Sequence, residues 1–509
     1  MSSLVPCAGR AKRGSVQLEG DDASQAGAPA SRGCYLMIRF PHHSALTGLA
    51  LLLATPAFAA APPITGPADL GTAVSAQVAC AGIFVSGRAE ADVLRDDVRA
   101  LAPFTQGISL AVDREARTVT ASTSGGAPRT AFYRPAAGCT LLTGDLSPAA
   151  LDAQTARLGP AWTGTEGPWP QPKTAPAKMV GGALESAVAA AFDGANTGGY
   201  PDTRAVVVIQ HGRILAERYA PGFDRNTRFL GWSATKSVMG TLVGILVDEG
   251  KLRLDAPAPI AEWQKPGDPR AAITLRQLLN MTSGLAFEEP YRPGSDSIRM
   301  LFQAGNMASV ALARPAEHAP GSNWSYSSGT SNILSEIVFR ATGGTLEGMT
   351  RFARKRLFDR AGMTSFLIEP DESGVMVGSS YGYATARDWA RFGLLYLNDG
   401  KANGKQLLSR DWVRFSSTPS DGARQFYAGQ FWLNRSDENG PKSTYFRNLP
   451  GDAFMAMGHN SQMIMVIPSR DTVIVRLGWT PEGQSFDYDK YLAPIVAALP
   501  ASGLAVSAR

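Results

Sequence analysis

The feature that most constrains this chain is a Ser-x-x-Lys motif at the start of a long apolar segment. Ser233 and Lys236 precede apolar residues that recur at helical spacing, namely Val238, Leu242, Val243, Ile245 and Leu246. This spacing predicts a buried helix, with Ser233 in its first turn and Lys236 one turn further along the same face. A lysine whose pKa is lowered by burial can take the proton of a serine hydroxyl, and a helix N-terminus favours the resulting alkoxide. The motif indicates a serine nucleophile with a lysine base or, alternatively, a helix-capping serine beside a solvated lysine.

An export signal is predicted that begins at Met37 and not at the first residue. Residues 37–59 read as a short basic start, a short apolar core and an Ala-x-Ala site that ends at Ala59. This pattern predicts a cleaved signal peptide, a mature chain that starts near Ala60, a periplasmic or secreted protein and no stable membrane anchor. An uncleaved N-terminal anchor is the alternative. We interpret the polar residues 1–36 as a mis-assigned start or a disordered extension.

Cysteine usage agrees with export. Cys7 and Cys34 precede the predicted cleavage site, which leaves Cys80 and Cys139 in the mature chain. An even pair in an exported protein predicts a disulfide, worth ~4 kcal/mol for a loop of this length. Two unpaired buried cysteines are the alternative.

Residues 60–155 are predicted to form a small α+β module without a catalytic set of its own. The expected elements are a strand at 83–85, a helix start within 88–94, a hairpin of 109–112 with 118–122, and a strand at 130–133. The following residues, 156–178, are rich in Pro, Gly and Trp, which predicts an extended linker that lies against a domain surface.

Residues 179–500 are predicted to form the main domain. An early hairpin (205–210 with 214–219) is followed by several helical segments, four late strands and a closing helix at 489–499. This order differs from a βαβ alternation, so it predicts an antiparallel sheet with an inserted helical subdomain.

Charge and histidine content argue against two classes of function. A formal charge of +5 is small for 509 residues, and no dense Lys/Arg run is present, so we predict no nucleic-acid partner. The histidines beyond the predicted cleavage site, His211, His318 and His459, lack ligand-like spacing. We therefore predict no metal and no other cofactor.

Several motifs of the main domain together resemble the serine beta-lactamase and penicillin-binding-protein superfamily. They are Ser233-x-x-Lys236, the tyrosine loop around Tyr326, Met281-Thr282-Ser283-Gly284-Leu285, Ala384-Thr385-Ala386-Arg387-Asp388 and the run from Gly458 to Gly478. The nearest branch is similar to class C-like esterases and to the hydrolase of aminohexanoate dimers. The resemblance covers about residues 180–500. It implies an α+β fold with a five-stranded antiparallel sheet flanked by helices.

Carried over residue by residue, the resemblance implies a complete acyl-transfer site. Ser233 is the nucleophile, Lys236 is its base, and Tyr326 protonates the leaving group and helps to activate the deacylating water. The backbone amides of Ser233 and His459 form the oxyanion hole, where loss of one donor typically costs ~10²–10³ in rate. Substrate contacts are expected from Trp232, Ser328, the His459 ring and Asn460, although a strand-end His459 without a role is the alternative.

Two departures from the lactamase pattern bear on the substrate. Tyr326-Ser327-Ser328 replaces the usual Tyr-x-Asn, and Gly458-His459-Asn460-Ser461-Gln462 stands where lactamases carry Lys-Thr-Gly. The nearer branch has glycine at the place of Ser461. Without that lysine, recognition of a beta-lactam carboxylate is disfavoured. We expect a small-molecule ester or linear amide as substrate.

Other interpretations remain open at the level of sequence. Gly378-Ser379-Ser380-Tyr381-Gly382 matches a nucleophile elbow, which would make Ser380 the nucleophile of an α/β-hydrolase. A penicillin-binding or sensor-type domain that is acylated without turnover is another. The oligomeric state and the role of the N-terminal module are left undetermined.

Overall fold

The structure is a computed structural model that describes residues 61–164, 166, 169, 182–193, 203–419, 424–437 and 444–500. The predicted signal peptide at 37–59 and the preceding residues 1–36 lie outside the described residues. So does most of the predicted linker beyond residue 164. Trp169 of that linker is described, and its Nε1 donates a hydrogen bond to the Gly212 carbonyl at 2.8 Å.

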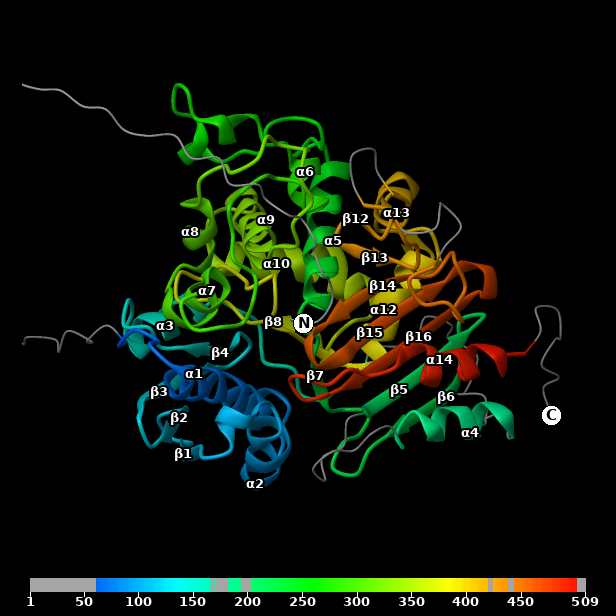
Figure 1. Cartoon of the computed structure of the whole chain (residues 1–509), viewed down its shortest axis with the longest axis horizontal. Coiled ribbons are helices and arrows are strands. Elements are labelled where there is room, and N and C mark those ends of the chain that lie inside the picture. The colour runs from blue at the N-terminus through cyan, green and yellow to red at the C-terminus, as the bar shows by residue number, and fades with distance from the viewer. Residues whose placement is uncertain are drawn as a thin grey trace, which may run out of the picture. The chain divides into compact units, whose positions relative to one another are not determined.

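The main domain is built on one antiparallel sheet (Figure 1). Its strands, in spatial order, are β12 (Tyr427–Ala428), β13 (Phe431–Leu433), β14 (Phe454–Gly458), β15 (Gln462–Ile467), β16 (Thr472–Gly478), β5 (Thr203–Gln210) and β6 (Arg213–Tyr219). All neighbouring pairs are antiparallel. The expected count of five strands is corrected to seven, because the short strands β12 and β13 add to the β14 edge and bury Phe431 and Leu433 there.

Helices cover both faces of this sheet. Every residue of β5 is buried, as expected for a strand with two covered faces. Val206 and Val208 pack in the hydrophobic cluster that includes α4 (Ala183–Ala190) and α14 (Tyr488–Ala497). Val207 and Ile209 alternate with them and join the cluster that includes α5 (Ala234–Asp248) and α12 (Ala386–Leu397). Figure 1 shows α4 and α14 running beside β5 and β16.

A helical subdomain is inserted between two strands of a small second sheet. β7 (Arg228–Leu230) pairs with β9 (Gly382–Thr385), and β9 pairs with β8 (Leu367–Ile368). The intervening chain forms α5 and then α6 (Leu275–Leu279), α7 (Asp296–Gln303), α8 (Met307–Leu312), α9 (Ser328–Ala341), α10 (Leu346–Ala353) and α11 (Asp359–Ala361). The predicted inserted helical subdomain is confirmed.

The N-terminal module packs one long helix on a four-stranded antiparallel sheet. The helix is α1 (Pro67–Cys80), and the strands are β1 (Ser109–Asp113), β2 (Thr118–Thr123), β3 (Gly126–Arg134) and β4 (Gly138–Leu141). The predicted hairpin and third strand are confirmed. α1 was not predicted, because its residues are buried on nearly every side and show little helical periodicity.

The predicted strand at 83–85 is wrong. Ala81–Val85 continues α1 as a wider π-helical turn, since a short apolar run cannot by its pattern be told from a helix end. The predicted helix start is confirmed by α2 (Glu90–Val93). Within the described residues, Pro67–Val85 is the one helix long and apolar enough to cross a membrane, and 89% of its most apolar window is buried inside the protein.

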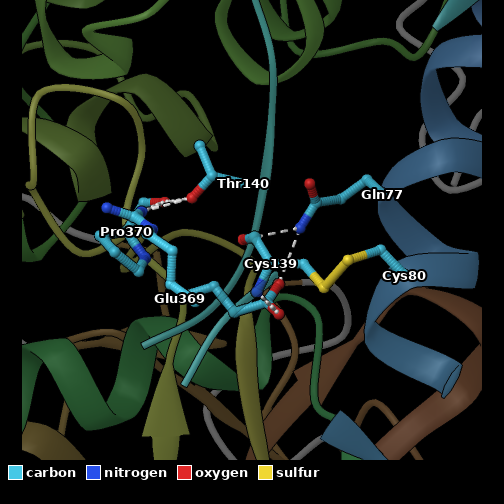
Figure 2. The surroundings of a disulfide bond; sticks show 7 residues. Gln77, Cys80, Cys139, Thr140, Glu369 and Pro370 are labelled. Atoms are coloured by element: carbon cyan, nitrogen blue, oxygen red, sulfur yellow. Dashed lines mark hydrogen bonds between the residues drawn. A yellow bond between two sulfur atoms is a disulfide. The ribbon is translucent and has the colours of Figure 1, made fainter. Parts of the chain in front are cut away.

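The module is joined to the main domain at a buried carboxylate beside the predicted disulfide. Cys80 and Cys139 are bonded, with their Cα atoms 6.1 Å apart, which confirms that prediction. The two oxygens of Glu369 accept hydrogen bonds from the Cys139 amide at 2.6 Å and from Gln77 Nε2 at 2.7 Å (Figure 2). Thr140 Oγ1 adds a bond to the Pro370 carbonyl at 2.7 Å. Burial raises the pKa of Glu369 to about 8, against the opposing effect of these donors.

Candidate active site

Ser233 lies at the end of the tight turn that joins β7 to α5. It occupies the N-cap position of α5, and only 6% of the residue is exposed. The preceding Trp232 has φ of 47°, in the left-handed region that a bulky side chain disfavours. At Gly231, a Cβ atom would meet the Trp389 ring at 2.2 Å, so glycine is required there. Backbone strain and close packing together fix the direction of the Ser233 side chain.

Lys236 lies one turn along the helix, as predicted, with its amine beside the serine hydroxyl. The residue is 1% exposed. Its Nζ lies 3.0 Å from Ser233 Oγ, 3.0 Å from Ser328 Oγ and 2.9 Å from the Ser379 carbonyl oxygen. Burial lowers the pKa of Lys236 from 10.5 to about 8, while the nearby Glu289 opposes that shift. The amine is therefore half neutral near pH 8.

Ser328 and Glu289 lie next to Lys236. Ser328 is fully buried at the start of α9, and its hydroxyl donates to Glu289 Oε1 at 2.6 Å. The Ser328 backbone N–H donates to Glu289 Oε2 at 2.7 Å. Burial raises the pKa of Glu289, against the opposing effects of Lys236 and of these two donors. Sequence reasoning missed Glu289, because it lies on an irregular loop and no spacing links it to Ser233.

Tyr326 lies within reach of the Ser-Lys pair. The centre of its ring is 5.0 Å from Lys236 Nζ, and the ring packs against Trp432 and Tyr427. Burial raises the pKa of Tyr326 well above 10, and an interaction with the Ser233 side chain acts in the opposite direction. The buried hydroxyl completes no well-aligned hydrogen bond with any described residue. The phenol thus keeps its proton at neutral pH and has it available for a partner.

The end of β14 lies against the nucleophile turn. A Cβ atom at Gly458 would meet the Gly231 carbonyl oxygen at 2.1 Å, so the two backbones touch there, and the ring of the next residue, His459, contacts that of Trp232. Neither the Ser233 nor the His459 amide donates any of the described backbone hydrogen bonds that link turns and loops. Two N–H groups at such a meeting point suit a developing oxyanion.

The His459 ring completes an uncharged wall of the site. It contacts Trp232 and Tyr291 edge to face, with ring centres 5.5 and 5.6 Å apart. Burial lowers the pKa of His459 to about 4, so the imidazole is neutral at physiological pH. The ring thus contributes aromatic surface to this wall without a positive charge.

The loop after His459 is strained and firmly held. Asn460 and Ser461 have φ of 56° and 64°, and Ser461 stands where glycine would carry no strain. Arg476 donates to the carbonyls of both residues, at 3.2 and 2.8 Å. The Asn460 side chain donates to the Thr480 carbonyl at 2.8 Å. These bonds fix the backbone that follows the His459 amide.

The structure does not support the alternative nucleophile Ser380. A nucleophile elbow needs a parallel sheet and a strand-turn-helix, whereas the main sheet is antiparallel and Ser380 is followed by strand β9. Ser380 is fully buried, and its hydroxyl bonds to that of Ser379 at 2.9 Å. In the described ranges no three His, Cys, Asp or Glu side chains gather closely enough to hold a metal ion.

A cavity of about 1020 Å³ opens elsewhere, between the N-terminal module and the main domain. Arg228 and Trp162 help to line it, whereas Ser233, Lys236 and Tyr326 do not. The chemistry of its buried groups, and not this cavity, therefore identifies the candidate site.

A buried serine-lysine pair and a buried tyrosine lie together between an antiparallel sheet and an inserted helical subdomain, an arrangement that suits a serine hydrolase. Comparison with known families agrees. The family described as Beta-lactamase matches residues 189–498, which is more than half of the chain. The chain belongs to the Beta-lactamase family.

Two kinds of relatives are similar to this chain. The 6-aminohexanoate-dimer hydrolase of Paenarthrobacter ureafaciens is 26% identical over 299 residues, which cover 55% of this chain and 73% of that protein. Among solved structures, a putative 6-aminohexanoate-dimer hydrolase from Bacillus anthracis is 23% identical with a TM-score of 0.48, over 58% of this chain and 78% of that one. A family VIII carboxylesterase is 16% identical with a TM-score of 0.47, over 62% of this chain and 96% of that one.

Proposed function

We propose that the protein cleaves a carboxylic ester or a linear amide through an acyl-enzyme on Ser233, with Lys236 as general base and Tyr326 as general acid. The observation that carries this proposal is the position of the buried Lys236 amine, 3.0 Å from Ser233 Oγ. Its pKa, lowered to about 8, gives a substantial neutral fraction at physiological pH.

In the acylation step, Ser233 Oγ attacks the substrate carbonyl carbon while its proton passes to Lys236 Nζ. The carbonyl oxygen becomes an oxyanion, which the amides of Ser233 and His459 stabilise. When the bond to the alcohol or amine breaks, Tyr326 gives its proton to the leaving atom and regains one from Lys236. The raised pKa of Tyr326 supports this role, because the phenol is protonated before each turnover.

In the deacylation step, a water molecule replaces the departed group. Tyr326 accepts a proton from this water as it passes its own to neutral Lys236, and the resulting hydroxide attacks the acyl carbon. Ser233 Oγ then leaves with the proton that Lys236 returns. Net hydrolysis therefore consumes one water and leaves all three side chains as they began.

Substrate preference is proposed from the surroundings of the pair. Tyr326 belongs to an aromatic group with Trp324, Tyr427 and Trp432, and His459 belongs to another with Trp232 and Tyr291. Because the His459 ring is neutral at physiological pH, these walls favour an uncharged apolar acyl or leaving group over a carboxylate. The hydrolase names of the relatives are compatible with an ester or amide substrate.

A substrate panel tests this function. We expect the wild-type protein to cleave p-nitrophenyl esters, to show weak or no activity on nitrocefin, and to label with a fluorophosphonate. Ser233→Ala should abolish labelling, whereas Ser380→Ala should retain it. Tyr326→Phe, which removes only the hydroxyl, should lower kcat by about 10²-fold or more. An initial burst of product without steady-state turnover would support the acylated-sensor alternative instead.

We also propose that the protein is exported and that its signal peptide is removed after Ala59. The Cys80–Cys139 disulfide supports an oxidising compartment. Intact-mass measurement of the protein recovered from periplasm and medium tests this. A mass that starts near Ala60 is expected, and a full-length mass in the membrane fraction would favour an uncleaved anchor.

A further inference from the structure

We propose that Glu289 is a positioning residue, which holds the Ser328 proton and thereby turns the free electron pair of Lys236 toward Ser233. This inference rests on the proposed roles of Ser233 and Lys236. It assigns Ser328 to the orientation of the base, in place of the substrate contact that the sequence suggested.

The contacts of Ser328 carry the first step of the argument. Glu289 accepts both protons that Ser328 can donate, from the hydroxyl at 2.6 Å and from the backbone N–H at 2.7 Å. A serine hydroxyl has one proton and two acceptor sites. Since that proton points to the carboxylate, Ser328 Oγ can only accept a hydrogen bond from Lys236, which lies 3.0 Å away.

Counting protons on Lys236 gives the second step. A neutral amine has two N–H donors and one electron pair. The Ser379 carbonyl, 2.9 Å away, can only accept, and so can Ser328 Oγ in this orientation. Both N–H groups are therefore used, and the electron pair is left facing the third neighbour, Ser233 Oγ, at 3.0 Å. The base is aimed at the nucleophile before substrate arrives.

The same arrangement supports the amine after proton transfer. The ammonium has three N–H donors, and all three neighbours are oxygen atoms that can accept them. Glu289 adds a negative charge two hydrogen bonds away, on the far side of Ser328. It is the third group that orients a base beside a nucleophile.

Glu289→Gln tests the orientation. The backbone N–H of Ser328 holds the new amide oxygen, so the amide NH₂ faces Ser328 Oγ and donates to it. The Ser328 proton is then free to bond to the electron pair of Lys236. We expect kcat to fall about 10²-fold, the lower range of general-base effects, with little change in KM. Glu288→Gln is the matched control. The Glu288 carboxylate is next to Glu289 in the sequence, but it is exposed and pairs with Arg292.

A double variant separates positioning from a general structural role. If Glu289 acts through Ser328, Glu289→Gln in a Ser328→Ala background should cause no further loss. Equal losses in both backgrounds would overturn the proposal. So would wild-type kcat in Glu289→Gln.

The pH profile provides a readout that misfolding would not produce. Among the described residues, the titratable groups besides Lys236 that interact with Glu289 are Tyr291, Tyr326 and Tyr427, whose pKa values are all raised by burial, so they stay neutral. Removing the negative charge should lower the pKa of Lys236 and move the acid limb of kcat/KM to lower pH. An acid limb of kcat/KM at the same pH in Glu289→Gln as in the wild type would contradict the proposal.

Fluorophosphonate labelling distinguishes the two levels of failure. If the wild type is not labelled at Ser233, the proposed function itself fails. If it is labelled and Glu289→Gln behaves like Glu288→Gln in kcat and pH profile, only the positioning role of Glu289 fails.

Discussion

Two enclosed carboxyl groups, those of Glu289 and Glu369, have almost the same hydrogen bonds and very different surroundings. Each accepts one bond per oxygen, at 2.6 and 2.7 Å. Around Glu289, the donors belong to Ser328, whose hydroxyl also touches a titrating lysine. Around Glu369, the donors are a backbone amide and a glutamine, neither of which can change protonation.

The difference shows that partner chemistry decides what a buried carboxylate does. Beside Lys236, the orientation and charge of Glu289 act on a proton that can move. Beside the Cys80–Cys139 disulfide, Glu369 joins the N-terminal module to the main domain. We therefore expect changes at the first site to alter turnover with little loss of stability, and changes at the second to do the opposite.

The largest expected effect is on turnover, from Lys236→Ala. Removing one member of a catalytic unit should lower kcat by about 10⁴-fold or more. Esterase kinetics measure this, with circular dichroism to verify the fold. Lys251→Ala, at a lysine whose side chain is 53% exposed, should match the wild type. If Lys236→Ala retained turnover, Lys236 would not be the base, and the contrast between Glu289 and Glu369 would lose its catalytic side.

Loss of the disulfide should have the next largest effect, and on stability. The bond closes a separation of 59 residues, for which the chain-entropy relation gives about 4 kcal/mol. Denaturant unfolding of the Cys80→Ser, Cys139→Ser double variant measures this loss. Its kcat under folded conditions should stay within about twofold of the wild type, since the described hydrogen bonds of Lys236 involve neither cysteine. A large loss of kcat in the folded variant would show that the N-terminal module supports catalysis.

Glu369→Ala should destabilise the protein by about 2–4 kcal/mol, because two buried donors lose their acceptor. Equilibrium unfolding measures the effect, with Glu317→Ala on the exposed surface as control. Unchanged stability would show that the contacts of Glu369 between the two domains contribute little to the free energy of unfolding.

The junction also predicts a pH dependence of stability. The folded pKa of Glu369, about 8, lies above its ordinary value of 4.5, so the native state binds this proton more tightly than the unfolded state does. The contribution of Glu369 to stability is therefore complete below about pH 4.5 and is lost as the pH rises to about 8. The Glu369→Ala variant should lack this component in a series of unfolding curves.

The smallest effect is the pH dependence of turnover in the wild type. Because the reactive form of Lys236 is neutral and its pKa is about 8, kcat/KM should rise about tenfold per pH unit below 8 and level off above it. Ester hydrolysis between pH 6 and 10 measures this limb. A limb near pH 10.5 would mean that the amine is solvated.

Much of the site was predictable because its signals are local. Ser233 and Lys236 share one helix, so three residues of spacing place the amine beside the hydroxyl. Tyr326 lies at a loop before α9, and nearly continuous apolar runs predict β14, β15 and β16. Resemblance to known motifs added the proposed oxyanion role of the His459 amide, which neither spacing nor composition provides.

The sequence by itself determined most local elements of the main domain, the serine-lysine pair and the cysteine pairing, because each depends on spacing along one segment or on a single available partner. It did not determine α1 or the helical turn at Ala81–Val85, whose residues show little periodicity. Only the tertiary structure decided which carboxylates are enclosed. Gln77 and Glu369 are 292 residues apart, and Ser328 and Glu289 are 39 residues apart on segments without a shared period. Burial and partner geometry arise only when such segments pack together, and they set the pKa values of Lys236 and Glu369.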